Sequence, residues 1–233
     1  MQLIFKQSNF LHRKIVEVMK QFKVIDQLNL VDGVLMCKKP SKRSWQKAHF
    51  KQGDLDGACG VYSIAMSLNI LGVFKADDFN SDPDDVDNRK GKYRLINALN
   101  EYGLYRRGLK GHEIIEILTK HFAKKVSVRN IEKKEGDIKK IIISHIDNNE
   151  PVIVGIDYNK DDGHWIVAVG YKIDDKGNFE ALLTLDPGID SPTYCHWNGI
   201  LSLNKEERKT YGYSYNTSNN MVDISEIITL SRK

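Results

Sequence analysis

One cysteine lies where the character of the chain changes, in the stretch GDLDGACGVYSIAMSLNILG at residues 53–72. The residues before Cys59 are polar, acidic and punctuated by glycine, whereas those after it are apolar with helical spacing. This pattern predicts a helix over residues 58–71 with Cys59 in its first turn. Cys59 is therefore either a small core residue or a nucleophile. The second alternative is physically reasonable because a helix N-terminus stabilises the negative charge of a thiolate.

A nucleophilic thiolate needs a histidine to protonate the leaving group, and His164 is the candidate. It begins the strand-like run HWIVAVGYKI directly after the turn sequence NKDDG, where a rigid sheet presents side chains to a cleft. The other histidines are expected to be ordinary surface, half-buried or loop residues. Those in predicted helices are His12, His112, His121 and His145, and those in predicted loops are His49 and His196.

Asp186 ends the next apolar run, LLTLDPG, and is the candidate for orienting the histidine. If the turn DDKGN joins the two runs as an antiparallel hairpin, the start of the first run lies beside the end of the second. The partner of His164 then falls at about residues 186–188. The carboxylate of Asp186 would hold the imidazole in one tautomer and orientation.

The loop before Cys59 supplies a candidate for binding an oxyanion. Gln52 lies seven residues ahead of the cysteine, and its amide could act together with the backbone N–H of Cys59. Asp54 and Asp56 in the same loop suit a helix cap and only weakly suggest calcium. The cysteines lack the spacing of a zinc site or a disulfide framework, so we expect neither a metal nor a cofactor.

The predicted elements place helices first and strands later. A strand or hairpin arm with a VDG turn is expected over residues 24–37, a short strand at VSVRNI, and three further strands from PVIVGIDY to FEALLTLDP. This order predicts an α+β fold with a helical lobe up to about residue 150, followed by an antiparallel β-sheet lobe. Helices are expected over residues 10–23, 58–71, 92–102, 111–124 and 136–149.

The composition is that of an ordinary soluble chain of 233 residues, with 41% hydrophobic and 28% charged residues. No membrane span or signal peptide is predicted, so a cytoplasmic location is expected. The net charge of +4 is too small to indicate nucleic acid. The basic stretch 38–47 and the acidic stretch 77–90 are either solvated loops or a rim that selects a charged protein partner.

Three segments resemble the papain-like cysteine peptidases, and within them the C39-like branch: QGDLDGACGVYSIAMSLNILG, GHWIVAVGY and LTLDPG. The resemblance implies a papain-like fold in which Cys59 opens a central helix as the nucleophile. His164 would be the general acid/base, Asp186 its orienting residue and Gln52 the oxyanion-hole donor.

The chain departs from the family pattern at two places. The glutamine lies seven rather than six residues before the cysteine, which implies an extra loop residue or another donor, and Val61 stands where proline is common. The resemblance leaves residues 1–44 as a helical arm or lid ahead of a catalytic domain at residues 45–233.

These residues predict a thiol hydrolase that cleaves a peptide or isopeptide bond of a protein or peptide substrate through a thioester. The same residues also suit a glutamine deamidase, a transglutaminase-like enzyme or an acyltransferase of the toxin or effector type. A papain-like module that binds a partner without catalysis is the third alternative.

Overall fold

The computed structural model describes residues 21–38, 44–53, 57–73, 108–159, 162–204 and 211–233, together with Tyr93 and Asn97. The acidic stretch 77–90, Asp54 and Asp56 lie outside the described residues, as do most of the helices expected at 10–23 and 92–102. None of the helices in the described ranges has the length and apolar character needed to cross a bilayer.

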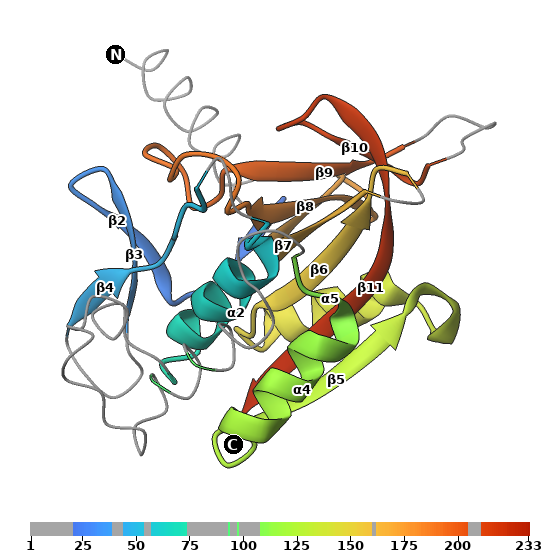
Figure 1. The fold of residues 1–233 in the computed structure, drawn as a ribbon. Coiled ribbons are helices and arrows are strands. Elements are labelled where there is room, and N and C mark those ends of the chain that lie inside the picture. Colours follow the sequence, from blue (N-terminus) through green and yellow to red (C-terminus); the bar gives the residue numbers. More distant parts are fainter. Residues whose placement is uncertain are drawn as a thin grey trace, which may run out of the picture.

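Six antiparallel strands form a closed barrel in the order β7–β6–β11–β10–β9–β8, with β8 pairing back onto β7 (Figure 1). Two more strands extend this sheet, since β1 pairs with β7 and β5 pairs with β11. The bounds are β1 Phe22–Val24, β5 Val126–Glu132, β6 Val152–Asp157, β7 Gly163–Ile173, β8 Phe179–Leu185, β9 Gly199–Leu203, β10 Tyr213–Tyr215 and β11 Asn220–Arg232.

The barrel closes through its two longest strands. β7 has 11 residues and pairs with β1, β6 and β8, while β11 has 13 residues and pairs with β5, β6 and β10. Irregularities in the register at Ala168/Gly170 and Ile224/Glu226 provide the bends that a curved sheet needs.

The described residues contain helices α2 (Cys59–Ile70), α4 (Gly111–Phe122) and α5 (Ile138–Asp147), with a short 3-10 turn η2 at Lys133–Glu135. The predicted helices at 58–71, 111–124 and 136–149 are confirmed to within two residues at each end. α2 and α4 share one buried cluster with β5, β6, β7 and β11. α5 packs into a second cluster with the barrel interior and the far side of α2.

A separate three-stranded antiparallel sheet stands beside the barrel and comprises β2 (Leu28–Val31), β3 (Val34–Lys38) and β4 (Trp45–Lys47) (Figure 1). Its first hairpin turns at Asp32 and Gly33, which both have positive φ, as a tight two-residue turn requires. The expected division between residues 44 and 45 falls between β3 and β4, which are hydrogen-bonded to each other. The arm or lid role of residues 1–44 stays a prediction.

The predicted fold class, a helical lobe followed by a sheet lobe, is wrong. The described chain is mostly β, strands precede α2 as well as following α5, and the sheet is a closed six-stranded barrel. α2 and α4 do not form a lobe of their own, because their apolar faces are buried against the barrel strands. The sequence predicted neither β9 nor β10, and after GYSYNTSNN it indicated only a short final strand or helix, where β11 completes the barrel.

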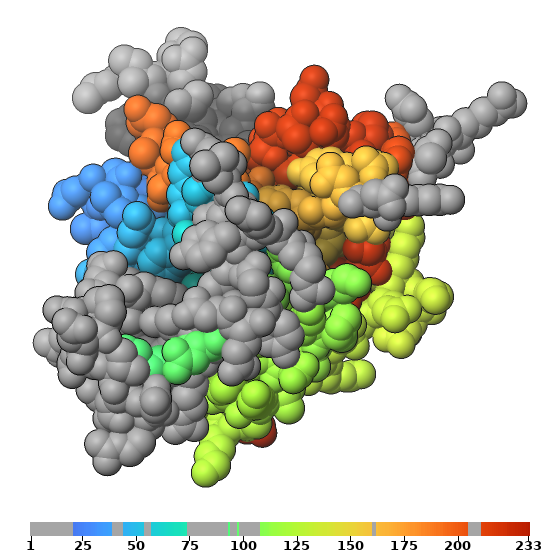
Figure 2. Space-filling model, viewed as in Figure 1, coloured from blue at the N-terminus to red at the C-terminus, as the bar shows by residue number. Residues whose placement is uncertain are grey.

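Segments far apart in sequence meet near the end of β6. Figure 2 shows the gold-coloured turn after β6 lying against the red C-terminal strands. A shallow pocket between the two segments is lined by Tyr158, Asn159, Asp162, Tyr211, Asn220 and Met221.

Candidate active site

Cys59 is the first residue of α2 and is 8% exposed. Neither Ala58 before it nor the first turn of the helix supplies an acidic side chain. The thiol therefore lies at the positive end of the helix dipole, where negative charge on sulfur is stabilised.

Close packing and one hydrogen bond hold the start of α2 against β7, and a second hydrogen bond ties β7 to the segment before α4. A Cβ atom on Gly60 would lie 3.1 Å from Leu109 Cβ and 3.3 Å from Trp165 Cδ1, so the helix approaches this closely only because residue 60 is glycine. Ser63 Oγ donates to the Trp165 carbonyl at 3.1 Å, and Trp165 Nε1 donates to the Leu109 carbonyl at 2.7 Å. Trp165 thus ties the helix that carries the thiol to the strand that carries His164.

His164 lies at the start of β7, and its ring contacts both of the other predicted residues. Nε2 donates to Asp186 Oδ1 at 2.7 Å, and the thiol of Cys59 lies close enough to the imidazole to raise its pKa. Because Nε2 is engaged by the carboxylate, Nδ1 is the ring nitrogen left for the thiol. Burial alone lowers the pKa of His164, but the interactions with Asp186 and Cys59 outweigh it and raise that pKa to about 10.

The predicted hairpin between the two strands is confirmed. β7 and β8 pair antiparallel, with Val167 opposite Leu185, and Asp186 follows directly after β8. The start of β7 and the end of β8 therefore meet at one edge, as the turn sequence DDKGN predicted.

Asp186 is buried, and both of its carboxylate oxygens accept hydrogen bonds. Oδ1 accepts from His164 and from the Gly188 backbone N–H at 2.7 Å. Oδ2 accepts from the Tyr215 hydroxyl at 2.5 Å and from Thr217 Oγ1 at 3.4 Å. Burial raises the pKa of Asp186, but these hydrogen bonds and the charge of His164 hold it below its usual value, so the group is ionised.

The backbone of Asp186 is held by two side chains that sequence reasoning missed. Asn198 Oδ1 accepts from the Asp186 N–H at 2.7 Å, while its Nδ2 donates to the carbonyls of Asp186 and Asp190 at 2.9 and 3.0 Å. His49 Nε2 lies 2.8 Å from the same Asp186 carbonyl. Burial lowers the pKa of His49, which keeps this histidine neutral with its proton on Nε2. Asn198 lies between strands and His49 in a loop, so neither carried a periodic signal.

Gln52 lies at the same cleft as Cys59 and His164. Its backbone N–H donates to the Pro187 carbonyl at 2.8 Å, which ties the loop before α2 to the turn after Asp186. Among the residues that the structure describes, none hydrogen-bonds the Gln52 side-chain amide. Its N–H donors are therefore available to a ligand.

The cleft has a volume of about 420 Å³ and opens directly on Cys59 and His164. Its lining includes three carboxylates, Asp157, Asp162 and Glu226. Burial, together with the nearby Glu132 and Asp157, raises the pKa of Glu226. In the described part of the chain, no three or more His, Cys, Asp or Glu side chains are grouped so that they could hold a metal ion.

A family model described as the Peptidase_C39 like family matches residues 42–221. The match covers most of the chain, so the chain belongs to the Peptidase_C39 like family. The resemblance seen in the three sequence segments is thereby confirmed.

Two other comparisons add little. The crystal structure of UfSP from C. elegans matches with a TM-score of 0.39 and 12% sequence identity over 91% of this chain and 34% of that one. This chain thus spans about a third of the length of that neighbour. No curated protein matches the sequence.

Proposed function

We propose that the chain is a cysteine peptidase that hydrolyses a peptide or isopeptide bond with Cys59 as nucleophile. The observation that carries the proposal is the imidazole of His164, which is hydrogen-bonded to the carboxylate of Asp186 and lies with the thiol of Cys59 at one open cleft. A nucleophile, a base and a group that orients the base are the three parts that acyl transfer requires.

The raised pKa of His164 determines that the imidazole carries its proton before the reaction begins. At neutral pH the imidazole is charged, and it stabilises a Cys59 thiolate. The thiolate attacks the carbonyl carbon of the substrate, and His164 then gives its proton to the leaving amine as the C–N bond breaks. Neutral His164 next takes a proton from water, whose oxygen attacks the thioester and releases the acid and the thiolate.

The oxyanion that forms in each step needs hydrogen-bond donors to stabilise its negative charge. In this proposal they are the backbone N–H of Cys59 and the side-chain amide of Gln52. The support for Gln52 is its place at the cleft and an amide that no described residue engages. Gln52→Ala is expected to lower kcat about 100-fold while KM changes little, because these contacts strengthen only in the transition state.

The activity can be tested by incubating the chain with an unfolded protein and with branched isopeptide substrates, followed by mass spectrometry. Cleavage is expected, and Cys59→Ala should abolish it. Cys195→Ala is the matched control, because that half-buried thiol donates to the Trp197 carbonyl and is absent from the cleft lining. Iodoacetamide should label Cys59 faster than Cys195.

The other outcomes separate the alternatives. Conversion of glutamine to glutamate without chain cleavage would show that the chain is a deamidase and not a peptidase. Transfer of an acyl group to an added amine would show that it is a transglutaminase-like enzyme. Equal turnover by the unmodified chain and Cys59→Ala would overturn the assignment of the nucleophile.

A further inference from the structure

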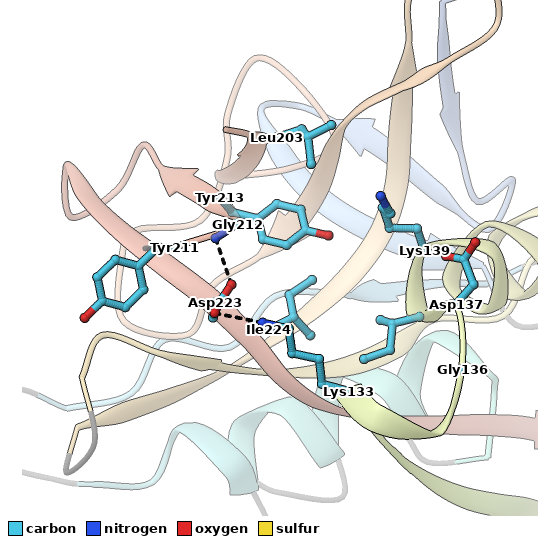
Figure 3. A pocket seen from close by; sticks show the side chains of 11 residues that line it. Lys133, Gly136, Asp137, Lys139, Leu203, Tyr211, Gly212, Tyr213, Asp223 and Ile224 are labelled. Carbon is cyan, nitrogen blue, oxygen red and sulfur yellow. Dashed lines mark hydrogen bonds and ion pairs between the residues drawn. The ribbon is translucent and has the colours of Figure 1, made fainter. Parts of the chain in front are cut away.

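A second cavity of about 380 Å³ lies on another part of the barrel, between the β10–β11 hairpin and the start of α5 (Figure 3). It shares no lining residue with the cleft at Cys59. Its volume is within the range of small-molecule sites. The described residues that line it come from η2, the start of α5, the end of β9, β10 and β11.

Tyr213 on β10 brings its hydroxyl to this cavity. The residue is only 8% exposed, and its hydroxyl makes no hydrogen bond to any residue that the structure describes. Figure 3 shows the hydroxyl pointing into the cavity. Burial, together with Asp223 and Asp137, raises the pKa of Tyr213 to about 12, so the group stays protonated and can donate. A hydroxyl that faces a cavity and has no protein partner is free to hydrogen-bond a ligand or water there.

Lys139 supplies a second donor. Its half-buried side chain lies across the cavity from Tyr213 and forms no ion pair within the described ranges (Figure 3). The acidic side chains are already engaged. Asp223 accepts from the Gly212 N–H and from Lys133, both at 2.8 Å.

Asp137 is engaged in the same way, because it caps α5 through the Lys140 N–H and lies 3.5 Å from the Lys140 ammonium. The groups left without partners are therefore both donors, and they call for a ligand that accepts hydrogen bonds and carries negative charge. The nearby carboxylates of Asp137 and Asp223 would repel a dianion, which favours a carboxylate over a phosphate.

The remaining walls are apolar and consist of Leu203, Ile138, Ile224 and the ring of Tyr211. We propose that this cavity binds a carboxylate at the end of an apolar group, with the carboxylate between Tyr213 and Lys139. Two sources share that chemistry: a free aliphatic acid, and the C-terminal residue of a peptide. The site is separate from the proposed peptidase activity and stands without it.

Calorimetry with octanoate, octanol and octylamine tests the charge requirement on the full chain. Octanoate is expected to bind at least about tenfold more tightly than octanol, and octylamine should not bind detectably. A short peptide ending in leucine with a free carboxylate, compared with its amide, tests the second source. Tighter binding of the acid peptide than of octanoate assigns the site to a C-terminus, and the reverse order assigns it to a free acid.

The variants Tyr213→Phe and Lys139→Met should each weaken octanoate binding about tenfold. Lys120→Met is the matched control, because that lysine is exposed on α4 and is absent from the cavity lining. Iodoacetamide labelling of Cys59 should stay unchanged in both variants, which shows that they fold. Equal binding of octanoate and octylamine, no binding of either acid, or full affinity in Lys139→Met would overturn the proposal.

Discussion

Tyr215 donates its hydroxyl to Oδ2 of Asp186 at 2.5 Å, while His164 donates to Oδ1 of the same carboxylate at 2.7 Å. Tyr215 is 1% exposed, so water does not compete for this bond. The hydrogen bond from Tyr215 fixes the rotation of the carboxylate, and the carboxylate in turn fixes the orientation of the imidazole. The geometry at His164 thus depends on β10, a strand about fifty residues further along the chain.

Tyr215→Phe is expected to lower kcat about tenfold with little change in KM, because Asp186 loses a charge-assisted hydrogen bond of about 1.5–3 kcal/mol. Steady-state kinetics on a cleaved peptide checks this. Tyr171→Phe is the matched control, since it also removes a tyrosine–aspartate bond, to Asp147 at 2.8 Å, but far from the cleft. Equal loss of kcat in both variants would contradict a role in positioning Asp186.

The pH profile should show His164 directly. Because the pKa of His164 is raised to about 10, kcat/KM is expected to persist into alkaline solution and to fall as the pH passes that value and the imidazole loses its proton. Among the contacts that raise this pKa, the hydrogen bond to Asp186 is the largest. Asp186→Asn should therefore move the alkaline limb to lower pH, and an unmoved limb would refute the pairing.

The same shift links stability to pH. A histidine whose pKa is higher in the folded chain stabilises it fully below the unfolded value of 6.5, and loses that contribution as the pH rises toward about 10. Urea unfolding should show the free energy of unfolding falling across this window. His164→Ala should flatten that part of the curve, whereas His112→Ala, on the exposed face of α4, should not.

Asn198→Ala should lower the free energy of unfolding by about 1–3 kcal/mol, because it leaves the backbone N–H of Asp186 without a partner. Chemical denaturation measures the loss. Asn178→Ala is the control: its side chain bonds Asp174 in an exposed turn, and its removal should cost less than about 0.5 kcal/mol. Comparable losses in the two variants would mean that Asn198 does no more than an ordinary turn residue.

Gly60→Ala should destabilise the chain by about 1–3 kcal/mol, since the new methyl group would press on Leu109 and Trp165. This exceeds the gain of about 1 kcal/mol that alanine brings to a helix. Ser144→Ala, at an exposed position of α5, reports the propensity effect alone. Thermal unfolding distinguishes the two, and a stabilised Gly60→Ala would show that the contact relaxes.

The sequence could predict the local geometry of the candidate site. His164 lies at the start of one strand and Asp186 directly follows the next, and a five-residue turn joins the two strands. The hairpin therefore brings both residues to one edge despite the register irregularity at Ala168/Gly170. The position of Cys59 at the start of α2 could be predicted because apolar residues with helical spacing follow it directly. The catalytic roles of these residues stay predictions until activity is measured.

The fold class could not be predicted in the same way. Closure requires β11 to pair with β6 some seventy residues earlier, and no local pattern specifies such a partner. Tyr215 lies in GYSYNTSNN, which resembles a loop because β10 has only three residues. Its contact with Asp186 becomes visible only once the barrel exists.

Barrel closure also sets the order in which the site matures during synthesis. A ribosome releases the chain from its N-terminus, so α2 and its thiol emerge long before residues 220–232. Until β11 is made, β6 and β10 lack a shared neighbour, and the sheet that carries Tyr215 and Asp186 stays open. A nascent or prematurely terminated chain would therefore carry Cys59 on an open sheet and not on a closed barrel.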